Sequence, residues 1–249
     1  MSLIDLCRLE PGSPIEVSED LVVTLNGYSS LDNSVLKNRL ASQSFGAHVW
    51  FFEGGSSSYL PLLSEEERSR HSYYKFSEDR ESYLFSHGLL RVLLGYYLSL
   101  DPRLVPINYE SGGRPYVPSV EGLGVNISLS HSGRAVMYAF SKQRVGADVE
   151  RIRGDVDFDN VASNILTAGD ANRFNHLPQL EKMTLFYKMW TARESSYKAV
   201  GGKLADFKVK LDDSLNPDIS IGEWTPRLRV HFFKVFDDYL GALTVTDHG

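Results

Sequence analysis

The sequence NISLSHSGRAVMYAFSKQRVGADVER, residues 126–151, decides the fold class. It holds three short segments rich in β-forming residues, at 127–130, 135–140 and 145–149, separated by His-Ser-Gly and Lys-Gln-Arg. Short segments of this kind, joined by brief polar connections, are typical of successive strands of one sheet. We therefore predict a β-sheet near the middle of the chain.

Helical patterns flank this sheet on both sides. The residues Ser64-Glu-Glu-Glu67 fit a capping box, and apolar side chains recur at helical spacing between residues 77 and 98. After the sheet, residues 167–170 predict another helix start. A long helix is predicted over 180–200, and Gly201-Gly202 is expected to end it.

The order of strand, helices and strands occurs twice along the chain. A strand is predicted at 47–52, before the first helices, and closing strands follow the last helix at 207–211, 228–235 and 239–245. We predict an α+β fold of two similar α/β halves, each a small mostly antiparallel sheet packed with helices, related by pseudo-twofold symmetry. The halves are expected at 46–144 and 145–249, with an N-terminal extension of unknown role at 1–45.

Composition limits the classes of function. The 249 residues carry a net charge of −6, whereas nucleic-acid binders usually have a basic excess. The single Cys7 excludes an intrachain disulfide and a thiolate zinc cluster. The apolar run at 89–98 contains Arg91 and is shorter than the roughly 20 residues of a membrane span. We expect a cytoplasmic monomer with no nucleic-acid or membrane partner.

Three carboxylates are candidates for a metal site. Asp148 and Glu150 alternate on a predicted strand, so both would project from one face, where a cation would relieve their repulsion. Such oxygen ligands suit magnesium, although a solvated strand face explains the pattern equally simply. Glu194 and Lys198 lie four residues apart on the predicted long helix and share a face, as a surface ion pair also would.

Other polar residues are candidates for holding phosphate. His131-Ser-Gly follows a strand and can present an imidazole, a hydroxyl and a backbone amide, or can simply be a tight turn. Arg114 lies in a glycine-rich turn, and Arg70 and Lys75 lie in a locally basic stretch that can also be a wet helix face. None of these patterns is specific by itself.

The order and spacing of four blocks are specific. These blocks are GRPY at 113–116, NISLSHSGR at 126–134, VGADVER at 145–151 and WTARESSYK at 190–198. The chain resembles the phosphopantetheinyl transferases of the surfactin-synthetase-activating type over about residues 47–245. Two departures stand out: Arg193 replaces the lysine that usually precedes the helix glutamate, and Glu67 stands where some members have a lysine.

The resemblance implies a role for each candidate residue. Magnesium would be bound by Asp148, Glu150 and Glu194, with Glu194 and Lys198 as catalytic residues. The coenzyme A phosphates would be contacted by residues from several blocks, namely Arg70, Lys75, Arg114, Ser130, His131 and Lys198.

The reaction that the resemblance implies is attack by a serine hydroxyl of an apo-acyl or peptidyl carrier protein on the β-phosphorus of coenzyme A. The carrier gains phosphopantetheine, and 3′,5′-ADP leaves. The proton acceptor would be Glu194 or a metal-bound water. Two alternatives remain, a magnesium-dependent nucleotide pyrophosphate hydrolase and a non-catalytic module that binds coenzyme A or a carrier. We expect carrier docking on the long helix around Lys182, Tyr187 and Lys188.

Overall fold

The computed structural model of the protein describes residues 15–18, 21–25, 47–54, 57–110, 112–118, 125–222 and 227–246. The described residues up to Lys142 form one compact unit, and those from Gln143 onward form a second. We call them the N-terminal unit and the C-terminal unit. The boundary lies between the second and third strands of the stretch quoted above.

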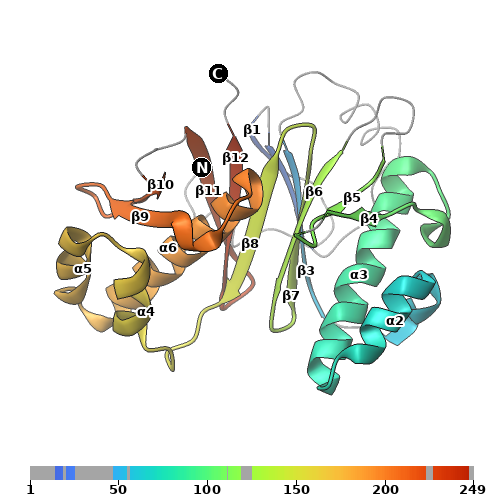
Figure 1. Ribbon diagram of the computed structural model, residues 1–249, viewed down its shortest axis with the longest axis horizontal. Coiled ribbons are helices and arrows are strands. Elements are labelled where there is room, and N and C mark those ends of the chain that lie inside the picture. Colours follow the sequence, from blue (N-terminus) through green and yellow to red (C-terminus); the bar gives the residue numbers. More distant parts are fainter. Residues whose placement is uncertain are drawn as a thin grey trace. The chain divides into compact units, whose positions relative to one another are not determined.

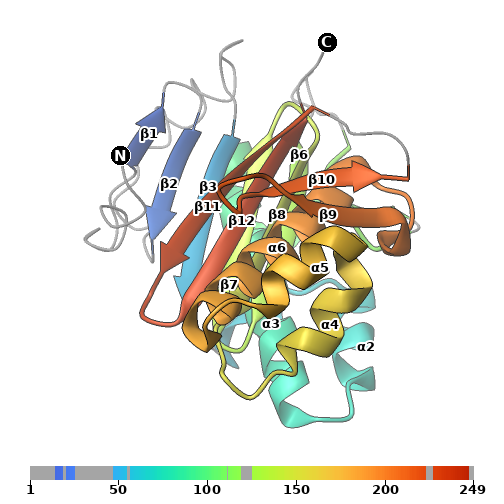
Figure 2. The same ribbon diagram turned by 90° about the vertical axis from the view of Figure 1, so that its left-hand side faces the viewer.

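The N-terminal unit is built on a seven-stranded sheet in the order β1-β2-β3-β7-β6-β5-β4. Its neighbouring strands are antiparallel except for β2 and β3, which are parallel. The strands are β1 (Ile15–Ser18), β2 (Leu21–Leu25), β3 (Ala47–Glu53), β4 (Asn108–Tyr109), β5 (Pro115–Tyr116), β6 (Asn126–Ser132) and β7 (Ala135–Ser141). Figure 2 shows β1 and β2, which come from the N-terminal extension, extending the sheet beside β3.

The long helix of this unit buries an apolar face against the sheet. The helices are α2 (Glu65–Tyr73) and α3 (Ser77–Leu98), with 3-10 turns at η2 (Ser57–Leu62) and η3 (Pro102–Leu104). Leu89, Leu90 and Leu93 of α3 join one core cluster with Trp50 and Tyr138 of the sheet. The apolar run at 89–98 is therefore a buried helix, as its length predicts.

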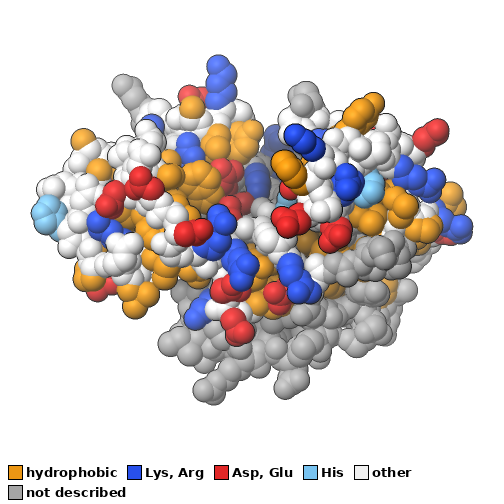
Figure 3. Space-filling model, turned by 90° about the horizontal axis from the view of Figure 1, so that it is seen from below, with side chains coloured by type: hydrophobic (Ala, Val, Ile, Leu, Met, Phe, Trp, Pro, Cys, Tyr) orange, Lys and Arg blue, Asp and Glu red, His pale blue; other side chains and the backbone are white. Residues whose placement is uncertain are grey.

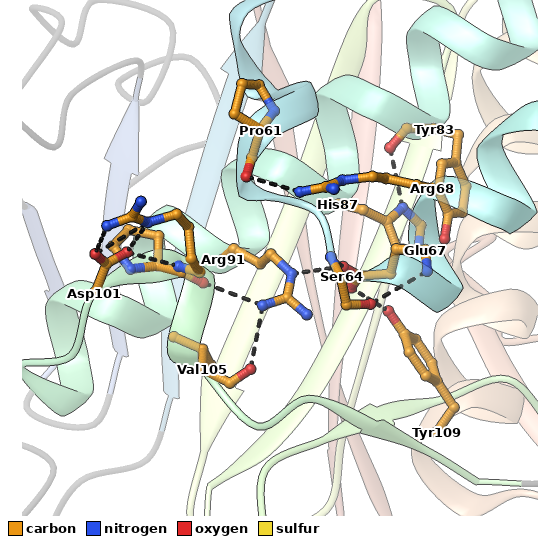
Figure 4. A network of polar contacts seen from close by, with 12 residues as sticks. Pro61, Ser64, Glu67, Arg68, Tyr83, His87, Arg91, Asp101, Val105 and Tyr109 are labelled. Carbon is orange, nitrogen blue, oxygen red and sulfur yellow. Dashed lines mark hydrogen bonds and ion pairs between the residues drawn. The ribbon is translucent and has the colours of Figure 1, made fainter.

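Arg91, inside that apolar run, is buried and ion-paired. Its Nε lies 2.5 Å from Oε2 of Glu67, and both side chains are 3% exposed. The guanidinium also donates to the carbonyl oxygens of Pro102 and Val105, while Glu67 accepts from the Tyr109 hydroxyl (Figure 4). Glu67 completes the predicted capping box with Ser64. These partners satisfy two charges that would otherwise be costly to bury.

A second polar group lies in the core of this unit. Trp50 Nε1 donates to the Tyr97 hydroxyl at 2.7 Å, and the Tyr97 oxygen lies 2.6 Å from His48 Nδ1. Nδ1 accepts from the hydroxyl or donates to it, depending on the tautomer of His48. The contact ties α3 to β3.

The C-terminal unit repeats the same order of elements. Strands β8 (Val145–Arg151), β11 (Leu228–Val235) and β12 (Tyr239–Thr246) form an antiparallel sheet in the order β11-β12-β8. A strand, a 22-residue helix and a hairpin follow one another in each unit, and the first strand pairs with the last: β3 with β7, and β8 with β12. The α+β fold of two similar halves is thus confirmed.

The remaining elements of the C-terminal unit surround its long helix (Figure 1). Helix α6 (Gln179–Val200) shares a core cluster with α4 (Phe158–Ile165), α5 (Ala168–Asn175) and the separate pair β9 (Phe207–Leu211) and β10 (Pro217–Ile221), and η4 (Leu204–Asp206) precedes β9. The predicted long helices and main strands are all present, whereas α4 and β10 were not predicted. None of the described helices combines the length and apolarity that crossing a membrane requires.

Candidate functional site

Close packing between β8 and α6 sets the geometry of the C-terminal candidate residues. A Cβ atom on Gly146 would lie 1.8 Å from the carbonyl oxygen of Ser195 and 2.5 Å from the backbone nitrogen of Ala199. Only glycine fits this approach. The Ser195 hydroxyl also lies 2.8 Å from that of Thr244, which pairs with Gly146 across the sheet. Strand β8 and helix α6 therefore approach each other closely at Gly146, two residues before Asp148.

Both carboxylates of β8 face α6, as their alternation predicts. The ammonium of Lys198 donates to Oδ1 of Asp148 at 2.7 Å, and Asp148 is 3% exposed. The indole Nε1 of Trp190 donates to Oε1 of Glu150 at 3.2 Å. Trp190, Glu194 and Lys198 are spaced four residues apart and share one face of the helix. The structure thus brings the predicted strand and helix residues of this unit together.

Glu194 is half-buried between the charges of this group. Burial raises its pKa above the ordinary value, and the negative charge of Asp148 raises it further, whereas Lys198 and Arg193 oppose the rise. The carboxyl group therefore accepts a proton more readily than an exposed glutamate. It is also close enough to Asp148 for the two charges to repel.

The donor set suits magnesium in its chemistry. Asp148, Glu150 and Glu194 offer carboxylate oxygens, the ligands that magnesium prefers, and a divalent cation would relieve the repulsion that raises the pKa of Glu194. Within the described ranges, however, no three His, Cys, Asp or Glu side chains are already arranged to hold a metal ion. Asp148 instead binds the ammonium of Lys198. The magnesium site therefore remains a prediction.

The N-terminal unit carries the other predicted phosphate contacts. His131 is exposed on β6, which continues to Ser132, so the tight turn lies at Gly133-Arg134 and not at His131-Ser-Gly as expected. Its Nδ1 lies 3.2 Å from the hydroxyl of Ser82 on α3. The strand and not a turn therefore presents the imidazole.

Arg70 and His131 lie around one half-buried histidine, His87. Burial lowers the pKa of His87 to about 4, and both His131 and Arg70 lower it further. The His87 ring is stacked on Tyr83 at a centroid distance of 3.8 Å. The sequence analysis did not predict Ser82 and His87 as site residues, because the pattern of α3 indicates only a helix that packs against a core. The neighbourhood of His131 includes both.

The other predicted contacts are more dispersed. Lys75 is exposed between α2 and α3, with its ammonium over the Phe76 ring, and Arg114 is half-buried just before β5. Ser130 is buried, because it precedes His131 on β6 and so projects from the opposite face. Acidic and basic side chains are interspersed on this unit, at the right of Figure 3, with a histidine among them.

Comparison with known proteins identifies the family. Residues 144–244 match the 4′-phosphopantetheinyl transferase superfamily, and residues 56–143 match the N-terminal region of 4′-phosphopantetheinyl transferases. The chain is 30% identical over 177 residues to the 4′-phosphopantetheinyl transferase HetI of Nostoc sp. strain PCC 7120, an alignment that covers 68% of this chain and 74% of HetI. The chain belongs to the 4′-phosphopantetheinyl transferase superfamily.

Two Bacillus subtilis relatives extend the comparison. One 4′-phosphopantetheinyl transferase is 25% identical over 75% of this chain and 83% of its own length. The 4′-phosphopantetheinyl transferase Sfp of strain 168 is 26% identical over 61% of this chain and 68% of its own length. Coenzyme A is a substrate of this superfamily, and its members modify carrier proteins.

Two positions at which the chain departs from the superfamily pattern have structural roles here. Glu67 belongs to the buried network with Arg91 and the cap of α2, so its carboxylate is turned away from solvent. Arg193 is buried and donates to the carbonyl oxygens of Leu204 and Phe207 at 2.8 Å each. Arg193 thus holds the backbone after α6 with two hydrogen bonds from separate nitrogens of its guanidinium group. The arginine therefore does more at this position than supply a positive charge.

Two of the three residues named for the predicted docking surface on α6, Lys182 and Tyr187, are buried, whereas Lys188 is half-buried. Lys182 is buried, its ammonium donates to Asp159 Oδ1 at 2.8 Å, and it lies over the Phe174 ring. The buried Tyr187 exchanges hydrogen bonds with the backbone of Arg153. These side chains cover the core because α4 and α5 pack over this part of the helix. A carrier cannot contact them without displacing that packing.

Proposed function

We propose that the chain transfers the 4′-phosphopantetheine group of coenzyme A to a serine of an apo-acyl or peptidyl carrier protein. The observation that carries the proposal is the group formed by Asp148, Glu150, Glu194 and Lys198, which lies inside the region matched to the superfamily. The serine oxygen forms a bond to the β-phosphorus, the bond from that phosphorus to the nucleotide oxygen breaks, and 3′,5′-ADP leaves.

Asp148, Glu150 and Glu194 would hold magnesium. Bound there, magnesium would neutralise part of the charge on the pyrophosphate oxygens. The three side chains come from two elements that Gly146 allows to approach closely. The structure supports the choice of Asp148 and Glu150 through their shared orientation toward α6, which carries Glu194.

Lys198 and Glu194 have the most direct proposed roles. We propose that the Lys198 ammonium turns from Asp148 to a phosphate of coenzyme A, where it offsets charge on the leaving group. Glu194, with its raised pKa, would accept the proton that the serine hydroxyl loses. Both residues lie on one face of α6.

The N-terminal unit would bind the coenzyme through Arg70, Lys75, Arg114 and His131. All four side chains are at least partly exposed, and three carry a permanent positive charge. Ser130 is proposed as a neighbour of the bound coenzyme because it precedes His131, although its side chain is buried.

The two competing functions receive less support. The named relatives are transferases, which does not favour a nucleotide pyrophosphate hydrolase or a non-catalytic binding module. Location in the cytoplasm, which the single cysteine and the composition suit, and a monomeric state both stay predictions.

Mass spectrometry of apo-carrier proteins tests the proposal. With magnesium and coenzyme A, a carrier should gain about 340 Da on its serine, the mass of the transferred group. Asp148→Ala, Glu150→Gln and Glu194→Gln should each lower the rate strongly while the fold remains intact. Release of 3′,5′-ADP without any carrier would favour the hydrolase. Failure across fatty-acid, polyketide and peptide-synthetase carriers would reject the proposal.

A further inference from the structure

The contact between Ser82 and His131 joins two elements that are far apart in the sequence. Ser82 lies near the start of α3, and His131 lies near the end of β6. The Ser82 hydroxyl is 3.2 Å from His131 Nδ1, and the two positions are 49 apart in the sequence. Ser82 is half-buried, whereas His131 is exposed. A side chain held by the helix thus reaches one edge of an imidazole that faces solvent.

A hydroxyl can hold this ring in more than one protonation state. It donates to Nδ1 when the imidazole is neutral and carries its hydrogen on Nε2, and it accepts from Nδ1–H when the imidazole is charged. In these two states Nε2 carries a hydrogen, whereas in the neutral Nδ1–H tautomer, whose Nδ1–H the hydroxyl can also accept, Nε2 does not. Rotation of the ring by half a turn would place carbon instead of Nδ1 near Ser82 and lose the bond. The contact therefore selects one orientation of the ring.

The surroundings of His131 favour a fixed ring over a mobile one. The neighbouring His87 is neutral at physiological pH, because burial lowers its pKa to about 4, and it is stacked on Tyr83. The charges that act on this neighbourhood include Glu67, which is fixed in its ion pair, and Arg70 on α2. An imidazole that is already ordered loses less side-chain conformational entropy when it binds a ligand than a mobile imidazole does.

We infer that Ser82 is a positioning residue for His131: by bonding Nδ1, it directs Nε2–H toward a phosphate oxygen of coenzyme A. The inference rests on the proposed function only for the identity of the ligand. The orientation of the imidazole is a property of the free protein. Ser82 itself does not touch the reacting atoms.

The test combines nitrogen NMR of the histidine rings with coenzyme A binding. Protein with ¹⁵N-labelled histidine is compared with Ser82→Ala and Ser82→Thr, and the signals are assigned with His131→Gln. The wild-type and threonine proteins should show the same His131 ring nitrogen shifts, and the alanine protein should show a changed Nδ1 shift. Ser72→Ala is the matched control, because this exposed serine bonds only the carbonyl oxygen of Ser69.

Binding and kinetics then measure the consequence. Ser82→Ala should weaken coenzyme A binding and raise its KM by about 3- to 10-fold, the effect of one hydrogen bond, while kcat changes less and threonine restores the value. Unchanged His131 shifts in the alanine protein would overturn the inference, as would changed shifts with unchanged coenzyme A binding. If the wild-type protein bound no coenzyme A, the proposed function would fail, whereas the NMR comparison would still decide whether Ser82 orients His131.

Discussion

The ammonium of Lys198 lies 2.7 Å from Oδ1 of Asp148, one of the proposed magnesium ligands. Asp148 is buried, and Lys198 is 27% exposed at its side chain. A buried carboxylate needs a positive partner, and Lys198 supplies one. A magnesium ion bound at the proposed site would therefore compete with Lys198 for this oxygen.

Replacing Lys198 should make the stability of the protein depend on magnesium. Lys198→Ala removes the charge-assisted bond to Asp148 and should cost about 1–3 kcal/mol of unfolding free energy in a chelator. Added magnesium should stabilise the variant more than the wild-type protein, because the ion no longer competes with an ammonium. Urea unfolding with and without magnesium measures both effects. Lys210→Ala, at an exposed position of β9, is the control, and equal magnesium responses in all three proteins would contradict the competition.

Enlarging Gly146 should separate β8 from α6. In Gly146→Ala the new methyl group would meet backbone atoms of α6, which cannot rotate away. We expect a loss of about 1–3 kcal/mol, as in other overpacked cores, together with a large fall in transfer rate. Thermal unfolding and the carrier assay measure the two losses. Gly169→Ala is the matched control, since a Cβ there meets nothing within 4 Å, and a fully active Gly146→Ala would show that the close approach is not required.

The fold was predictable because its signals are local. The capping box at Ser64 and Glu67 and the apolar spacing of α3 specify helices directly, and the short β-rich segments specify strands. Helix α4 was missed because FDNVASNI contains weak helix formers, and its stability comes from packing Phe158 and Ile165 into the core.

The partners in the candidate site were less predictable. The alternation of Asp148 and Glu150 indicated their shared face, but nothing in the spacing shows that Lys198 binds Asp148 across 50 residues. Lys182 was wrongly taken as a surface residue because lysines are seldom buried. Here α6 is covered on several sides, and Asp159 supplies the partner that burial requires. Such pairings follow from tertiary packing.

The carboxyl group of Glu194 should lower stability at neutral pH. Because its pKa is raised in the folded protein, the folded state binds more protons than the unfolded state between the ordinary value of 4.5 and the raised value. Stability therefore falls as pH rises through this window, and the loss persists at neutral pH. In a chelator, Glu194→Gln should be more stable than wild type at pH 7, and the difference should shrink as pH falls below 4.5. Chemical denaturation across pH measures this, and a variant less stable at pH 7 would contradict it.

The buried pair of Glu67 and Arg91 should be the most sensitive polar contact of the N-terminal unit. Burial alone would raise the pKa of Glu67, yet Arg91 and the surrounding hydrogen bonds hold it below the ordinary value. Glu67→Gln leaves the Arg91 charge in the core without its counterion and should cost about 3–5 kcal/mol. The double variant Glu67→Gln with Arg91→Met should recover much of that loss, since no unpaired charge remains. Asp101→Asn is the control, because its ion pair with Arg103 is exposed, so breaking it should change stability little. Denaturant unfolding of the wild type, the two single variants, the double variant and the control measures these effects. Additive losses from Glu67→Gln and Arg91→Met would mean that the pair is not coupled, and that Glu67 stabilises the unit only as the cap of α2.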